Sequence, residues 1–343
     1  MKGSVRFAVV AAIAALAATF AGSALGALSP TFAVTGSRLG ADQAFGPTLS
    51  LSTQAADDPV ARVTIYVPPT YTLASPASPS STIGNVTATA QVADAGNATQ
   101  TLKGSIVGTP PTNQNAACDP GTHVAVWSMN LTVAGAGTAL IVPMYVDQAT
   151  GGETAYASYK VVICLPPPDV PAGTAGRSPL GAKLISATFD LDNFTGGANG
   201  ENVWRTLWVP YAKGTGQANA GGSVEAQSIV RVPTTVVLSG KKANGFVTLT
   251  GAVKELGNGI GGVSVTVGSG PRSTQLSKAK VVKTAPNGAF TARLKAKKVA
   301  WYGATAQVPQ RSLGASFCKA TFGVPCVSAT VGASRVVGRA VKR

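Results

Sequence analysis

Residues that could perform acid–base or nucleophilic catalysis are few in this chain. The 343 residues include a single histidine, His123, and 13 Asp and Glu residues. A serine or cysteine hydrolase needs a histidine that is held beside its nucleophile. His123 directly precedes a Val-rich segment, and the sequence contains no Gly-x-Ser-x-Gly motif. We therefore assign His123 a structural or surface role and predict no catalytic residue.

Paired carboxylates are the second chemistry to consider, because two of them on either side of a glycosidic bond can hydrolyse it. The Asp57-Asp58 pair lies in a polar loop and is expected to face water. A glycan hydrolase would need Asp190 or Asp192 to face Glu201 or Glu225 across a cleft. The spacing of these acids differs from that of an EF-hand calcium loop. We predict no metal ion and no cofactor, and we keep the hydrolase as an alternative.

The four cysteines indicate disulfides rather than metal ligands. They contain no Cys-x-x-Cys motif and the chain has one histidine, so no zinc signature is present. Four cysteines allow three pairings, and proximity in the sequence favours Cys118 with Cys164 and Cys318 with Cys326. Free buried thiols are the alternative. Disulfides persist mainly in oxidising compartments, so these pairings agree with export.

The first 27 residues have the three parts of a secretory signal peptide. Lys2 and Arg6 precede an apolar run from Phe7 to Phe20, and small residues follow up to Ala27. The run is shorter than the roughly 20 residues that a membrane-spanning helix needs. No second hydrophobic stretch follows it. We predict a secreted protein, extracellular or associated with the cell envelope, whose mature chain has no transmembrane segment.

Charge is distributed very unequally along the chain. Residues 231–343 contain 18 Lys and Arg residues and one acid, Glu255, whereas residues 28–230 contain 8 basic and 12 acidic residues. Such one-sided charge attracts anionic partners. Mixed charges would serve solubility equally well. We predict a polyanion-binding surface that is formed by Lys241, Lys242, Lys278, Lys280, Lys283, Arg293, Lys295, Lys297 and Lys298.

Three of these cations, Arg293, Lys295 and Lys297, occupy alternate positions and would share one face of a strand. The expected partner is an anionic cell-wall polymer or an acidic polysaccharide. Nucleic acid is not expected, because the chain carries an export signal and lacks a recognition helix or an aromatic RNA platform. A surface that is basic for solubility alone is the alternative. The sequence does not determine the oligomeric state.

The elements that must position these residues are predicted to be strands. Short Val- and Thr-rich segments alternate apolar and polar residues and end at Gly or Pro, and no helical periodicity follows residue 27. Such segments are typical of strands that are half buried against a second sheet. In the first part of the chain they are Ala61–Val67, Asn85–Val92, Val124–Val133, Ala139–Val146, Ser158–Leu165, Lys183–Phe189 and Val203–Val209.

The basic part has the same character. We predict an all-β protein with two β-sandwich domains, a larger one over residues 28–230 and a smaller basic one over residues 231–334. Residues 335–343 are expected to form a free basic tail, and the Pro- and Gly-rich residues 169–181 a long loop in the larger sandwich. The predicted strands of the smaller sandwich are Phe246–Val253, Val263–Gly268, Ala279–Thr284, Ala289–Leu294, Trp301–Val308 and Val327–Val331.

The smaller sandwich also carries a pattern of glycines and apolar residues. It reads G-x-V, G-x-x-V-x-V and T-x-x-x-G-x-F, at Gly251, Val253, Gly262, Val265, Val267, Thr284, Gly288 and Phe290. The pattern resembles that of bacterial Ig-like and carboxypeptidase-regulatory, transthyretin-like domains. The resemblance implies a small sandwich and no particular function. Within it, Asn287-Gly288 would supply the positive φ angles of a hairpin turn.

The larger sandwich is similar to uncharacterised secreted proteins of high-GC Gram-positive bacteria, in the segments CDPGTHVAVWSMNLTV, VPMYVDQATG and NVWRTLWVPY. This similarity implies a source and no mechanism. We expect a non-catalytic cell-envelope or extracellular protein that its basic module holds on an anionic surface. One alternative is the hydrolase, with the basic module as its targeting domain. The other is a self-assembling surface protein or adhesin that uses exposed edge strands.

Overall fold

The computed structural model describes residues 28–36, 46–73, 80–110, 118–133, 139–191, 193–196, 201–230, 234–255, 257–297 and 300–343. Their regular structure consists of β-strands and five short 3-10 turns, the longest being Gly151–Ala155. The all-β prediction is therefore confirmed. Across these residues, no helix has the length and apolar character needed to cross a membrane. The predicted signal peptide, residues 1–27, lies outside the described residues.

Thirteen strands form one large sheet, in which every pair of neighbours is antiparallel except the parallel pair of β13 and β22. A separate ribbon pairs β4 (Tyr71–Leu73) with β11 (Phe194–Gly196). The spatial order of the large sheet is β1 (Thr31–Gly36), β2 (Pro47–Ser52), β10 (Ala182–Asp190), β5 (Thr82–Val92), β6 (Ala98–Thr109), β7 (Ala125–Val133), β8 (Ala139–Gln148), β9 (Tyr159–Cys164), β3 (Val60–Val67), β12 (Asn202–Pro210), β13 (Val224–Val230), β22 (Cys326–Val331) and β21 (Arg311–Ser312).

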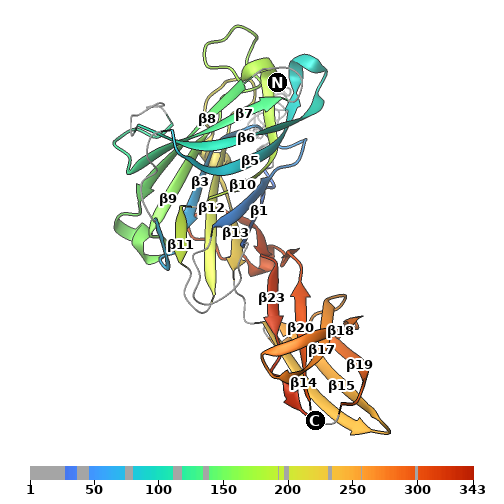
Figure 1. Cartoon of the computed structure of the whole chain (residues 1–343). Helices are drawn as coiled ribbons and strands as arrows, with labels where there is room; N and C mark the ends of the chain where they lie inside the picture. The colour runs from blue at the N-terminus through green and yellow to red at the C-terminus, as the bar shows by residue number, and fades with distance from the viewer. Residues whose placement is uncertain are drawn as a thin grey trace, which may run out of the picture.

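The two ends of this sheet meet, so that the sheet encloses an apolar core (Figure 1). Strand β1 lies against β13 and β22. The Val34 N–H donates to Ser228 Oγ at 2.8 Å, and Ser328 Oγ donates to the Pro30 carbonyl at 2.8 Å. Trp127 and Trp204 are fully buried in the core. The alternation seen in the sequence thus places apolar side chains inside a sandwich-like layer arrangement.

A smaller sandwich lies beyond the β1 and β13 end of the large sheet (Figure 1). Alternate residues of its strands, such as Val265 and Val267, are buried with Phe290 in a second core. One of its two sheets contains β14 (Thr234–Ala243), β15 (Phe246–Glu255), β16 (Asn258–Gly259) and β19 (Ala289–Lys295). The other contains β17 (Ser264–Arg272), β18 (Gln275–Lys283), β20 (Trp301–Val308), β23 (Ser334–Val337) and β24 (Val341–Lys342).

The turn before β19 differs in detail from the expected hairpin turn. Only Gly288 has a positive φ, of 79°. Its N–H donates to the Ala285 carbonyl at 2.8 Å and closes a four-residue turn with Pro286 at its second position. A Cβ on residue 288 would lie 2.4 Å from the Val253 carbonyl oxygen, so both conformation and space require glycine there.

The chain passes between the large sheet and the small sandwich three times. It leaves after β13, returns after β20 to form β21 and β22, and leaves again to form β23 and β24 (Figure 1). The prediction that Val327–Val331 closes the small sandwich is therefore wrong, because β22 pairs with β13 of the large sheet. The prediction of a free tail over residues 335–343 is also wrong, because β23 and β24 both pair with β20.

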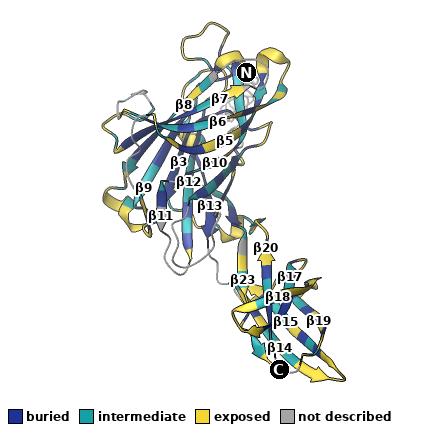
Figure 2. Ribbon diagram, viewed as in Figure 1, coloured by how far each residue is buried: buried dark blue, intermediate teal, exposed yellow. Residues whose placement is uncertain are grey.

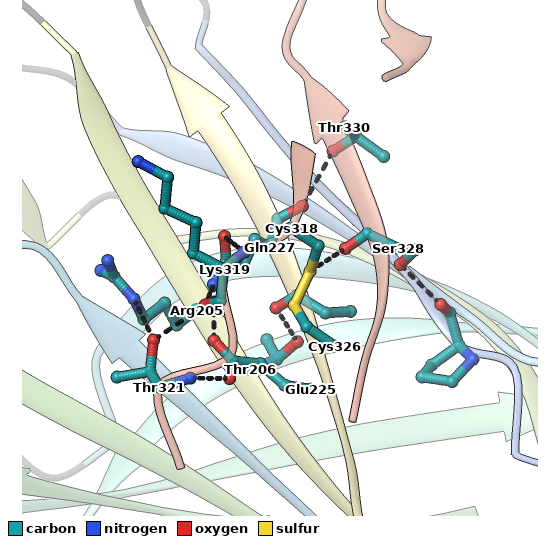
Figure 3. Close-up of a disulfide and its surroundings, with 12 residues drawn as sticks. Arg205, Thr206, Glu225, Gln227, Cys318, Lys319, Thr321, Cys326, Ser328 and Thr330 are labelled. Atoms are coloured by element: carbon teal, nitrogen blue, oxygen red, sulfur yellow. Dashed lines mark hydrogen bonds between the residues drawn. A yellow bond between two sulfur atoms is a disulfide. The ribbon is translucent and has the colours of Figure 1, made fainter. Parts of the chain in front are cut away.

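Both predicted cysteine pairs are joined, with Cα–Cα distances of 6.1 Å for Cys118–Cys164 and 5.6 Å for Cys318–Cys326. The second disulfide closes a loop that lies on the large sheet rather than in the small sandwich (Figure 3). Phe322 of this loop stacks on Tyr66 of β3, with 4.7 Å between ring centroids. The disulfide loop and β22 therefore dock together on the large sheet.

The close approach of β1 and β22 allows a test of this docking. A Cβ on Gly332, directly after β22, would lie 2.1 Å from the Val34 carbonyl oxygen. Gly332→Ala should therefore lower the free energy of unfolding by about 1–3 kcal/mol through overpacking. Gly152→Ala is the matched control, because its Cβ would meet nothing within 4 Å. Urea unfolding measures both, and equal stabilities of the two variants would contradict the observed contact.

Candidate functional site

The nine predicted cations do not form one stripe, and five of them divide between the two outer faces of the small sandwich. Lys241, Arg293 and Lys295 lie on the outer face of the sheet of β14, β15 and β19. Lys278 and Lys283 lie on the outer face of the opposite sheet. Lys242, Lys280 and Lys297 are also exposed, as is much of the surface of the small sandwich (Figure 2). Lys242, near the end of β14, lies close to Lys297, which follows β19, and Lys280 lies in the edge strand β18. Lys298 lies outside the described residues.

The expected common face of Arg293, Lys295 and Lys297 holds for the first two only. Strand β19 ends at Lys295, and the Lys297 N–H donates to the Tyr302 hydroxyl at 3.0 Å. Arg293 is already engaged by an aromatic ring, because its guanidinium carbon lies 3.9 Å from the Phe246 ring centroid. A cation held over a ring at this distance is stabilised by the ring quadrupole. This face is therefore basic, and one of its cations, Arg293, already has the Phe246 ring as its partner.

The opposite outer face contains a groove of about 320 Å³. It is built from cross-strand rows, because residues that pair in antiparallel strands point to the same side of the sheet. One row runs from Lys283 through Ser264 and Gln307 to Arg335. Further rows pair Thr266 with Thr305 and Gly268 with Gly303. The groove is lined by Thr266, Gly268, Leu276, Lys278, Gly303, Thr305, Gln307 and Arg335.

A β-bulge directs Lys278 to this groove. In β18, Lys280 pairs with Val267, whose side chain faces the core. Regular alternation would give Lys278 the same orientation as Lys280. The register shifts between Val267 and Gly268, so that Lys278 pairs with Gly268 and lines the groove instead. Bulges re-aim side chains in this way, next to binding sites in particular.

The groove has two cations and no competing carboxylate of its own sandwich. Glu255 is the sole acidic side chain of residues 231–343. It is 9% exposed and pairs with Arg311 of β21, in the large sheet. Lys278 and Arg335 are exposed, and neither forms an ion pair with a described residue. The groove therefore presents cations, hydroxyls and the Gln307 amide to solvent, which is the donor set that binds phosphate, sulfate or carboxylate groups.

Sequence reasoning missed Arg335, the second cation of the groove. The sequence analysis expects residues 335–343 to form a free basic tail, because the chain is longer than the resembled domain needs. The β-branched pair Val336-Val337 was an available signal for a strand. Pairing of Arg335 with Gln307 is what brings it to the groove.

The acids considered for a hydrolase have different hydrogen-bond partners and different degrees of burial. Asp190 accepts a hydrogen bond from Thr48 Oγ1 at 2.6 Å, and Glu201 is exposed at the start of β12. Asp57 is buried rather than solvated as expected, since it accepts N–H groups from Ser29 and Gln54. Asp192 lies outside the described residues. No described pair of these acids shares hydrogen-bond partners across a cleft.

Glu225, the remaining candidate, is a buried structural acid. Its side chain is completely inaccessible on β13. Its carboxylate accepts the Thr321 N–H and the Gln227 side-chain amide, both at 2.6 Å (Figure 3). Gln227 in turn accepts the Lys319 N–H at 3.3 Å. The carboxylate therefore anchors the disulfide loop to the large sheet.

Comparison of the chain with protein-family models, with curated proteins and with solved structures found no match. The function is therefore argued from the groove and its charges alone.

The role of Glu225 gives a stability prediction. Glu225→Ala leaves the Thr321 N–H without its acceptor and removes one of the two acceptors of the Gln227 side-chain amide, in a buried place. This change should lower the free energy of unfolding by about 1–3 kcal/mol. Glu201→Ala, at an exposed position, should change it by less than about 0.5 kcal/mol. Denaturant titration of both variants measures the difference. A Glu225→Ala protein as stable as Glu201→Ala would mean that the anchor contributes nothing.

Proposed function

We propose that this chain is a secreted, non-catalytic cell-envelope or extracellular protein that binds an anionic surface polymer in the groove of its small sandwich. The observation that carries the proposal is that exposed cations without an ion pair line a concave polar surface. Lys278 and Arg335 line the groove, and no acidic side chain of the sandwich lies free to neutralise them. The two disulfide pairs support an oxidising, extracellular location.

The dimensions of the groove favour a linear polymer. The row from Lys283 to Arg335 crosses four strands, which at the usual strand spacing is about 14 Å. A chain with anionic groups at intervals of several ångströms can therefore contact both ends of the row at once. Thr266, Thr305 and Gln307 lie between the cations and can donate hydrogen bonds to its oxygens. An anionic cell-wall polymer or an acidic polysaccharide has these features.

Self-assembly through edge strands is a weaker candidate. Strand β18 is the edge strand of its sheet and carries Lys278, Lys280 and Lys283. Lysines on an edge strand repel a second identical edge and are a common means of preventing strand pairing. The same lysines that suit an anionic polymer thus oppose assembly at this edge.

Charge reversal in the groove tests the proposal. The full-length double variant Lys278→Glu/Arg335→Glu should bind an anionic polymer at least about tenfold more weakly, because each lost charge-assisted hydrogen bond is worth about 1.5–3 kcal/mol. Co-sedimentation at low salt measures binding to purified cell walls. Soluble polyphosphate and polygalacturonate, tested separately, distinguish a phosphate polymer from a carboxylate polymer.

The control variant Lys241→Glu/Arg293→Glu makes the same change in net charge on the opposite face of the sandwich. It should keep most of the affinity if the groove is the binding site. Equal losses in both double variants would show that net charge alone governs binding. No binding by the unaltered protein to any of the three probes would reject the proposed function.

The salt dependence of binding counts the cations that are involved. Three contacts, from the groove cations Lys278 and Arg335 and from Lys283 at the end of the neighbouring row, predict that log Kd rises with log salt concentration with a slope of about 2. Between about 0.05 and 0.5 M NaCl the affinity should therefore fall about a hundredfold. Titration calorimetry with polyphosphate across this range measures the slope. A slope near zero would mean that charge attraction does not drive binding.

A further inference from the structure

A second cluster of polar side chains lies on the large sheet and consists of Asp119, His123 and Asp147. His123 Nδ1 lies 3.1 Å and 3.3 Å from the two carboxylate oxygens of Asp147. Asp119 Oδ2 lies 4.0 Å from the same nitrogen. One ligand atom from each residue can be chosen so that all lie within 4.8 Å of one another. Among the described residues this is the only such group of three.

Strong local constraints hold these three side chains in place. Asp147 belongs to β8, and the Val124 N–H next to His123 donates to the Val146 carbonyl at 2.9 Å. Asp119 follows Cys118, whose disulfide ties it to the end of β9. The Cys118 carbonyl also accepts a hydrogen bond from Arg62 of β3 at 3.2 Å. Asp119 and His123 lie in the segment before β7, and the disulfide and these hydrogen bonds fix that segment to β8, β9 and β3.

The cluster holds two carboxylates that form no ion pair with a described Lys or Arg. The side chains of Asp119 and Asp147 are 20% and 18% exposed. The neighbouring cations have other partners: Lys160, which lies opposite Asp147 in β9, pairs with Glu153, and Arg62 donates to the Cys118 carbonyl. Asp119 Oδ2 is buried and accepts no hydrogen bond from the described residues. Burial, and next the charge of Asp147, raise the pKa of Asp119. A buried carboxylate oxygen without a donor is costly unless a positive charge faces it.

The imidazole is aimed at the carboxylates by its packing. Its side chain is 2% exposed, and its ring lies 4.4 Å from the Tyr145 ring, centroid to centroid. Its Nε2 is buried without a hydrogen-bond partner among the described residues. Rotation of the ring would place Nδ1 in this apolar contact. Nδ1 is therefore the nitrogen that is available as a ligand.

We propose that Asp119, His123 and Asp147 bind a zinc ion, with an open fourth position for water. Ligands about 2.1 Å from a tetrahedral zinc lie about 3.4 Å apart. The observed separations of 3.1 Å and 4.0 Å bracket this value, so small side-chain movements suffice. An imidazole ligand favours zinc over magnesium or calcium, which take oxygen ligands. The positive ion would neutralise the carboxylate pair and bind the disulfide-linked segment to β8.

The test uses full-length protein without a histidine tag, first treated with chelator and then titrated with zinc. Calorimetry should give one site per chain, and cobalt as a substitute should give the visible absorption bands of a tetrahedral ion. His123→Ala and Asp147→Asn should each weaken zinc binding at least about tenfold. Asp94→Asn, which removes an exposed carboxylate paired with Arg177, should bind zinc as the unaltered protein does.

Two further measurements make the outcome decisive. The thermal midpoint of the unaltered protein should rise with added zinc, and that of the isosteric double variant Asp119→Asn/Asp147→Asn should not. The double variant keeps the shape of the cluster, so it protects the test against misfolding of His123→Ala. Zinc affinity that is unchanged in the double variant would overturn the proposal. Failure of the unaltered protein to bind zinc at millimolar concentration would do so as well.

Discussion

The parallel pairing of β22 with β13 is the constraint on which the rest of the structure depends. Through it, residues that follow the small sandwich return to the large sheet, where Ala329 and Val331 are buried. The disulfide loop then packs on β3, where Phe322 stacks on Tyr66. The Glu225 carboxylate accepts a hydrogen bond from the backbone of this loop. In the sequence, β21 and β22 come between β20 and β23 of the small sandwich. The chain therefore connects the small sandwich to the large sheet both after β20 and before β23. Strand β23, which follows β22, brings Arg335 back to the groove of the small sandwich.

Most carboxylates of the large sheet have a defined partner, as Glu153 has Lys160 and Asp94 has Arg177. The sole acidic side chain of the basic part pairs with Arg311 of the large sheet. In the groove and around His123, charged side chains of one sign lie close together and form no ion pair with a described residue of opposite sign other than His123. In both places the surrounding strands fix the geometry, by a β-bulge in one and by a disulfide in the other.

Sequence periodicity located many strands but not their partners. Trp301–Val308 was predicted with the observed bounds, because each second residue is apolar and Pro309 follows. Strand β6 was missed, since its outward Thr, Gln and Lys residues and its glycines weaken the pattern, and β13 was missed because Glu225 and Gln227 are buried in it. Val327–Val331 was correctly predicted as a strand. The alternation of its residues does not show which sheet the strand joins, because it would be the same in either sheet. Lys278 and Lys283 were identified by charge alone, while the separation of Lys278 from Lys280 depends on a bulge that no local pattern reveals. The contact of His123 with Asp147 likewise depends on the β7–β8 register, since 24 residues separate the two.

The groove and the cluster around His123 differ in burial, and this difference determines which ligands each can hold. The groove is open to solvent, so mobile ions screen its cations and a partner must contact several of them to be held. A polymer satisfies that condition and a single small anion does not. The Asp119 and Asp147 carboxylates are largely withdrawn from water, where screening is weak and a single ion of double charge gains most. Raised salt should therefore weaken occupation of the groove far more than occupation of the cluster. A salt concentration that releases the protein from an anionic surface would then leave a metal ion bound in the cluster.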